Sequence, residues 1–119
     1  MDPELRDGFR LGSFLVYPLR NEFVGDEGPV HVPPRVMDVL LRLAADPGEV
    51  VPRQTLLDDV WEGVTVSDET LSRAVSELRS ALGERRGHHE YVQTVPKRGY
   101  RLVAPVTALG AMAGPVPAT

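Results

Sequence analysis

The sequence predicts an α+β fold in which a small antiparallel sheet precedes three helices and a β-hairpin closes the domain. Short apolar runs broken by glycine and proline occupy residues 8–32. Apolar residues recur at helical spacing between residues 33 and 83, and two apolar runs flank a tight turn in residues 91–103. A chain of 119 residues is long enough for one domain with a single core.

The first two helical segments each have an apolar face and a terminal signal. Residues 33–49, PPRVMDVLLRLAADPGE, have apolar residues three and four apart, with proline in the first turn and Pro47-Gly48 at the end. Residues 52–63, PRQTLLDDVWEG, turn their leucines, Val60 and Trp61 inward, and Gly63 ends them. Both segments therefore predict helices of a few turns.

The third helical segment spans residues 67–83, SDETLSRAVSELRSALG. Ser67 is placed to cap its amino end, acidic residues follow in the first turn, and Gly83 closes it. Residues 8–32 read as two or three strands of an antiparallel sheet. Strands, three helices and a final hairpin, in this order, give the outline of a winged helix-turn-helix.

One face of the third predicted helix is polar and carries no bulky apolar side chains. At about 100° per residue, the apolar stripe consists of Leu71, Val75, Leu78 and Leu82. The opposite face carries Glu69, Arg73, Ser76, Glu77 and Ser80, with Thr70 and Ser72 on its flanks. A helix that enters the major groove needs such a face, because these donors and acceptors read base edges. The alternative is an ordinary solvated helix surface.

The predicted hairpin, YVQTVPKRGYRLV, carries cations at its turn. Lys97 and Arg98 precede Gly99, which supplies the permissive backbone of a tight turn, and Arg101 follows. Beside a polar helix, these cations favour a wing that tracks DNA phosphates. The alternative is that they protect an edge strand against aggregation.

The net charge of −4 conceals an asymmetry along the chain. Residues 1–69 hold six arginines against fourteen acidic residues, whereas residues 70–101 hold seven basic residues against three acidic ones. A polyanion responds to the local field of a patch. The acidic balance therefore does not exclude nucleic acid as a partner.

Composition excludes several other classes of protein. Without cysteine there is no disulfide framework and no thiolate metal site. The amino terminus is too charged for a signal peptide, and no apolar run is long enough to span a membrane, so a cytoplasmic location is the default. Residues 104–119 are uncharged and rich in Ala, Gly and Pro, which predicts a linker or a frayed terminus.

No motif indicates an enzyme. His88-His89-Glu90 is the only cluster that invites metal or acid–base chemistry, but adjacent side chains diverge and a metal needs three or four converging ligands. Asp58, Asp59 and Glu62 fit a solvated helix face. We therefore expect no catalytic residues, no metal and no cofactor. A winged helix that serves protein contacts without binding DNA remains the alternative; an apolar third helix or an uncharged wing would indicate it, and neither is present.

Three stretches together resemble a known family. VVPRQTLLDDVWEG, VSDETLSRAVSELRSALG and YVQTVPKRGYRLV resemble the OmpR/PhoB-type winged-helix DNA-binding domain, and AVSELRSALG with TVPKRGYRL is most similar to its CadC/ToxR-like branch. The resemblance implies a four-stranded amino-terminal sheet, three helices, a hairpin wing and sequence-specific binding of double-stranded DNA in bacterial transcription regulation. It divides the chain into a disordered tail at residues 1–8, the domain at 9–103 and a flexible tail at 104–119.

The resemblance also assigns residues. It implies that the recognition helix, residues 67–82, lies in the major groove, and that the wing, residues 91–103, meets the backbone and minor groove. Residues 62–66 correspond to a loop that can touch RNA polymerase in this family. By position, the implied DNA contacts are Thr70, Ser72, Arg73, Ser76 and Glu77 in the groove, Arg79 at a phosphate, Thr94, Lys97 and Arg98 at the backbone, and Arg101 at the minor groove.

The chain departs from the family pattern in two respects. Ser76 and Glu77 stand where many relatives carry arginine, so Glu77 either accepts from a cytosine amino group or repels phosphate. The usual phosphorelay partner, a receiver domain, has no room in 119 residues. In the CadC/ToxR-like branch a linker, often with a membrane span, leads to a sensor region. Because no coiled-coil or apolar seam is visible, we expect a domain that is monomeric in isolation and tandem on DNA. If its parent chain is longer, the resemblance implies a tether to the inner membrane.

Overall fold

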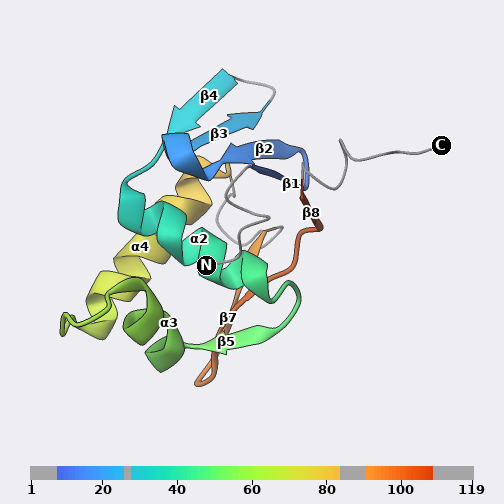
Figure 1. Cartoon of the computed structure of the whole chain (residues 1–119). Helices are drawn as coiled ribbons and strands as arrows, with labels where there is room; N and C mark the ends of the chain where they lie inside the picture. The colour runs from blue at the N-terminus through green and yellow to red at the C-terminus, as the bar shows by residue number, and fades with distance from the viewer. Residues whose placement is uncertain (1–7, 26–27, 84–90, 109–119) are drawn as a thin grey trace.

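The structure, a computed structural model, describes residues 8–25, 28–83 and 91–108. These residues form two antiparallel sheets and three α-helices, which confirms the predicted α+β class (Figure 1). In Figure 1 the amino-terminal sheet lies at the top, α2 crosses below it, and the second sheet lies at the bottom. The elements are β1 (Phe9–Leu11), β2 (Phe14–Tyr17), the 3-10 turn η1 (Pro18–Arg20), β3 (Glu22–Gly25), β4 (Gly28–His31), α2 (Pro34–Ala45), β5 (Val50–Pro52), α3 (Arg53–Val60), α4 (Asp68–Ala81), β6 (Val92–Val95), β7 (Gly99–Leu102) and β8 (Val106–Ala108).

The amino-terminal sheet has the strand order β4-β3-β2-β1-β8. Phe9 pairs with Val16 and Val16 with Phe23, so these fully buried side chains form one row on the inner face. The four strands before α2 match the number that the family resemblance implied. Reading two or three strands from the apolar runs was an undercount, because strands of three or four residues are too short to show a clear period.

The last strand of this sheet, β8, corrects a predicted boundary. Residues 104–119 were expected to be a flexible tail, yet Val106 pairs with Leu11 and the amide of Gly12 donates to the carbonyl of Pro105 at 3.1 Å. Composition did not reveal this strand because backbone pairing at a sheet edge needs no particular side chains. Of the expected tails at residues 1–8 and 104–119, residues 1–7 and 109–119 lie outside the described residues, as does the cluster at 88–90.

The first and third predicted helices are confirmed as α2 and α4. Helix α2 ends at Ala45, just before Pro47-Gly48, and buries its apolar stripe. Helix α4 is capped by Ser67, whose hydroxyl accepts from the amide of Thr70 at 3.4 Å. Its inner stripe of Leu71, Val75 and Leu78 is at most 1% exposed, as the helical spacing predicts.

Helix α3 is shorter than the predicted segment. It ends at Val60, and Trp61 follows with non-helical backbone, its amide still donating to the carbonyl of Leu57 at 3.1 Å. Trp61 is only 7% exposed and belongs to the hydrophobic core, as predicted. Leaving the helix at this point lets Trp61 pack inward while Gly63, with a φ of +71°, redirects the chain.

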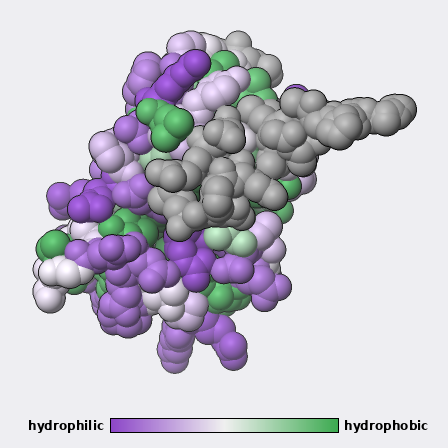
Figure 2. All heavy atoms as spheres, viewed as in Figure 1, coloured by the Kyte–Doolittle hydropathy of each residue, from purple (hydrophilic) through white to green (hydrophobic). Residues whose placement is uncertain are grey.

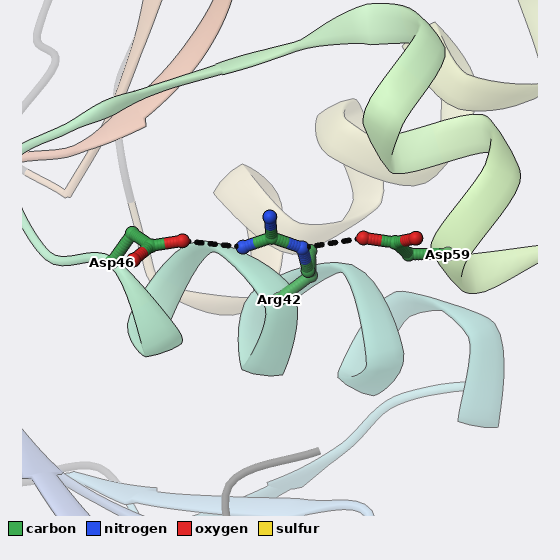
Figure 3. Close-up of polar contacts among 3 residues, drawn as sticks. All are labelled: Arg42, Asp46 and Asp59. Atoms are coloured by element: carbon green, nitrogen blue, oxygen red, sulfur yellow. Dashed lines mark hydrogen bonds and ion pairs between the residues drawn. The ribbon is translucent and has the colours of Figure 1, made fainter.

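Helices α2 and α3 are joined at their surface by Arg42. Its guanidinium donates to Asp46, which directly follows α2, at 2.8 Å and to Asp59 on α3 at 2.7 Å (Figure 3). The hydrogen bond to Asp59, followed by the one to Asp46, raises the pKa of Arg42. The two carboxylates thus hold a permanent cation between the helices.

The hairpin belongs to a second sheet with the order β5-β7-β6. The predicted hairpin is confirmed, whereas β5 was not predicted. Val51 pairs with Tyr100, and Tyr100 with Thr94, so these three residues share one face of the sheet. Strand β5 approaches Gly99 so closely that a Cβ there would clash with the carbonyl oxygen of Val51. Gly99 therefore serves the approach of β5 as well as the turn.

Candidate nucleic-acid interface

The outer face of α4 is polar and exposed along its length. Ser72, Arg73, Ser76 and Glu77 are exposed, and Thr70 is half-buried. This is the face that the helical period predicted, since the residues between them are buried. The predicted groove residues therefore share one surface.

Two of these residues already have partners in the protein. The hydroxyl of Thr70 lies 3.3 Å from that of Ser67, within the amino-terminal cap. The hydroxyl of Ser72 accepts from Arg53 at 3.2 Å. Both hydroxyls are thus oriented by the domain itself, and each keeps acceptor capacity for a further donor.

Arg73 stands out on this face. Among the described residues, its side chain forms no hydrogen bond or ion pair, and neither do those of Ser76 and Glu77. A shallow groove of about 320 Å³ runs beside them, bordered on the other side by His31 and Pro33. Arg73 is therefore a long donor that remains available to a ligand.

The turn between β6 and β7 forms an exposed cationic tip. Pro96, Lys97 and Arg98 are exposed, and the two cations have no side-chain partner in the described part of the chain. The amide of Arg98 donates to the carbonyl of Val95 at 2.9 Å, which closes the turn. Lys97 has a φ of +65°, an unusual conformation for a residue with a side chain. Figure 2 shows hydrophilic residues at the lower end of the molecule, where this turn lies in Figure 1.

Arg79 and Thr94, both predicted to meet DNA backbone, meet each other. Arg79, in the last turn of α4, donates to the hydroxyl of Thr94 at 2.6 Å and to the carbonyl of Val92 at 3.2 Å. Thr94 lies on β6, so this contact joins the carboxyl end of α4 to the hairpin.

Arg101 lies on the other face of the hairpin. It pairs with Gln93 across the strands, and its guanidinium donates twice to the side-chain oxygen of Gln93, from Nε at 2.9 Å and from a terminal nitrogen. Because side chains alternate along a strand, Arg101 points away from the face that carries Thr94 and Tyr100. Among the wing cations, Lys97 and Arg98 therefore lie at the tip without a side-chain partner in the described residues, whereas Arg101 is bound by Gln93 on the outer face.

Arg53 is a member of this region that sequence reasoning missed. It donates to the phenol of Tyr100 at 2.9 Å and to the carbonyl of Asp68 at 3.2 Å, and its guanidinium carbon lies 5.5 Å from the centroid of the Tyr100 ring. Its partners are distant in sequence, and it belongs to the acidic half of the chain. The only local signal was a cation at the start of a predicted helix.

The loop after α3 is exposed in the structure. Glu62, Gly63 and Thr65 face solvent, and the apolar side chain of Val64 is 55% exposed. Val66 turns back and packs against the core. The loop presented by residues 62–66 is therefore a surface of mixed polarity.

The described residues contain no group of three or more His, Asp or Glu side chains that could hold a metal ion. A hollow of about 800 Å³ beside α2 and α3 is lined by carboxylates such as Asp46 and Asp59, which Arg42 already binds. Nor is any of the described helices long and apolar enough to cross a membrane.

Comparisons with known proteins agree with this geometry. Residues 26–102 match the family model described as "Transcriptional regulatory protein, C terminal". The chain is 37% identical to the transcriptional activator CadC of Escherichia coli K12 over 98 residues, which cover 82% of this chain and 19% of CadC. The chain thus spans about a fifth of the length of that relative.

Solved structures of DNA-binding domains share the fold. The DNA-binding domain of E. coli CadC is similar with a TM-score of 0.78 at 35% identity, covering 85% of this chain and 95% of that one. The Klebsiella pneumoniae RstA DNA-binding domain, in a crystal structure of its complex with the RstA box, is similar with a TM-score of 0.69 at 26% identity, covering 81% and 96%.

Proposed function

The chain belongs to the family of transcriptional regulatory protein C-terminal domains, the OmpR/PhoB type, and from this premise we propose how it reads DNA. It is a transcriptional regulator DNA-binding domain of the CadC/ToxR/OmpR type, and the family is not one of enzymes. In the proposed complex, α4 lies in the major groove and the hairpin of β6 and β7 follows the backbone toward the minor groove.

The proposal rests on two exposed cationic surfaces whose side chains have no partner among the described residues. Arg73 projects from the slim polar face of α4, and Lys97 and Arg98 project from the hairpin tip. Arginine forms a bidentate pair with guanine, and exposed cations at a turn fit phosphates without reading sequence. Local positive charge at these places supports DNA binding in spite of the net charge of −4.

The remaining residues have supporting roles in this proposal. Thr70, Ser72, Ser76 and Glu77 surround Arg73 on the groove face and contribute short donors and acceptors. Arg101 approaches the minor groove from the outer face of the wing. Arg79 and Thr94 bind each other at the junction of α4 and the hairpin.

Beyond the domain, the proposal extends to a longer regulator. Because CadC is about five times the length matched here, we place this domain in a chain that also carries a sensor region. Residues 109–119 would serve as the linker, and the domain would work in the cytoplasm, tethered to the inner membrane in that parent chain. The loop of residues 62–66, with Val64 exposed, would touch RNA polymerase.

Selection of bound duplexes from a random pool, followed by titration of the enriched duplex at several salt concentrations, tests the proposal. We expect an enriched motif, with tandem half-sites bound more tightly than one, and an affinity that falls steeply as salt rises. The free chain should scatter light as a monomer. A chain with no affinity for any duplex at low salt would instead favour a winged-helix module that binds protein.

A further inference from the structure

Two arginines connect α4 to the hairpin, one at each end of the helix. Arg53 reaches the first turn of α4 from the start of α3, and Arg79 leaves the last turn of α4 toward β6. Both guanidinium groups donate hydrogen bonds to residues of the hairpin. We call Arg53 and Arg79 the bracing arginines, and α4 together with the β6–β7 hairpin the reading unit.

Arg53 is placed by the second sheet. It follows Pro52, which pairs with Gly99 at the start of β7, so its side chain begins beside the hairpin. One terminal nitrogen donates to the phenol of Tyr100 at 2.9 Å. The other donates to the carbonyl of Asp68 and the hydroxyl of Ser72, both at 3.2 Å. A single planar group therefore joins β7 to the amino end of α4.

Arg79 makes the matching connection at the carboxyl end. Its Nε and one terminal nitrogen donate to the carbonyl of Val92 at 3.3 and 3.2 Å, and the terminal nitrogen also donates to the hydroxyl of Thr94 at 2.6 Å. Thr94 lies directly opposite Tyr100 in the strand register. The bracing arginines thus end on neighbouring residues of the same face of the hairpin.

These contacts separate the arginines of the region by role. Arg53 and Arg79 each donate several hydrogen bonds within the protein, whereas Arg73 and Arg98 form no side-chain hydrogen bond within the described residues. A helix in one groove and a wing on the backbone must keep a fixed relation to meet DNA together. Preorganising that relation avoids an ordering cost on binding.

We propose that Arg53 and Arg79 are positioning residues that hold the reading unit in one arrangement, and that Arg79 does not serve as a phosphate contact. The inference rests on the proposed function, because the arrangement matters for binding DNA. In this proposal Thr94 does not contact the DNA backbone. Its hydroxyl instead accepts the hydrogen bond that positions Arg79. The planar fork of arginine is essential here, since lysine has the charge but carries its three donors on a single nitrogen and cannot reproduce the fixed geometry of the guanidinium.

The first test needs no DNA. Backbone amide hydrogen exchange is measured by NMR in the wild-type chain and in Arg79→Lys, Arg53→Lys and Thr94→Val. We expect exchange in residues 92–95 and 99–102 to rise about tenfold in each variant, because a hydrogen bond to a charged group is lost. Thr94→Ser, which keeps the hydroxyl, should exchange like wild type. Unchanged exchange in Arg79→Lys and Thr94→Val would overturn the proposal.

The second test measures affinity for the preferred duplex and for a random duplex across a salt series. Arg79→Lys and Thr94→Val should each bind the preferred duplex about tenfold more weakly, with the random duplex and the slope of log K against log salt unchanged. The double variant should lose no more than either single variant, because both remove one contact. Wild-type affinity in Arg79→Lys, or a slope reduced by about one unit in Arg79→Ala, would identify a phosphate contact and overturn the proposal.

The two tests keep this inference distinct from the proposed function. A wild-type chain that binds no duplex contradicts the proposed function whatever the exchange data show. Normal DNA binding together with unchanged exchange in the variants contradicts only the bracing role.

Discussion

On α2, Asp38 lies one turn after Arg35, and their charged groups are 3.7 Å apart. Arg35 also donates to the carbonyl of Val60 at the end of α3, at 2.9 Å. Burial raises the pKa of the Asp38 carboxyl above its ordinary value of 3.8, and the charge of Arg35 offsets only part of that rise. The folded state therefore keeps a proton on Asp38 at pH values where the unfolded chain has lost it.

The sign of this shift predicts a pH dependence of stability. Because the folded state binds more protons in the window just above pH 3.8, the free energy of unfolding contributed by Asp38 falls as pH rises through it. Asp38→Asn removes this titration, so its stability should vary less across the window and be no lower than wild type at neutral pH. Urea unfolding of both proteins between about pH 3 and 7 measures the difference.

A direct titration provides the control. The carboxyl carbon shift of Asp38, followed by NMR, should give a pKa above 3.8, and Arg35→Gln should raise it further by removing the opposing charge. A pKa at or below 3.8 in the wild-type chain would contradict the prediction.

Trp61 should contribute strongly to the stability of the hydrophobic core. The residue is 7% exposed and belongs to the hydrophobic core. Trp61→Ala should cost about 3–5 kcal/mol through lost burial and a cavity. Thermal and urea unfolding measure the loss, with Val64→Ala, at an exposed neighbouring position, expected to stay within about 0.5 kcal/mol of wild type. A melting temperature near that of wild type for Trp61→Ala would be incompatible with its buried position.

The helices were predictable because each carries its own signals. The cap at Ser67, the stop at Pro47-Gly48 and the apolar stripes are all local features. Strands β5 and β8 have three residues each and owe their conformation to distant partners, as Val51 does to Tyr100 and Val106 to Leu11. Such strands are set by tertiary pairing, which no short window of sequence displays.

The candidate site shows the same difference between features that are local in sequence and features that depend on tertiary packing. The exposure of Arg73, Lys97 and Arg98 followed from helical spacing and from the turn, and the structure agrees. The contacts of Arg53 and Arg79 within the protein depend on how α3, α4 and the hairpin pack together, so the sequence alone did not reveal them. Exposure on a helix face or at a turn is easier to predict than a contact between elements distant in sequence.

Arg73 should carry base discrimination. It is an exposed long donor on the face of α4 and lacks a partner in the described structure. If it forms a bidentate pair with guanine, Arg73→Ala should lose about 1–3 kcal/mol on the preferred duplex and flatten preference at one base pair. Titration against duplexes with single substitutions measures both effects. Arg10→Ala, on the exposed side of β1, removes the same charge outside the interface and should change neither. Uniform weakening across all duplexes would assign Arg73 to a phosphate instead.

The tip of the hairpin should supply affinity that is independent of sequence. Lys97 and Arg98 are exposed, and neither has a side-chain partner among the described residues. Lys97→Gln and Arg98→Gln remove one charge each, and glutamine at 97 keeps a side chain in the backbone conformation with a φ of +65°. Each variant should weaken binding to matched and mismatched duplexes nearly equally. Each should also reduce the slope of log K against log salt by about one unit.

Arg101→Gln provides the contrast for these two variants. It lies on the outer face of the wing and binds Gln93, so its removal should mainly reduce preference for A·T-rich flanking sequence, where a narrow minor groove attracts a cation. Arg10→Gln again controls for net charge. Unchanged affinity and salt slope in both Lys97→Gln and Arg98→Gln would mean that these cations only protect the hairpin from edge-to-edge association. The hairpin would then have no part in binding DNA, and α4 alone would have to account for affinity.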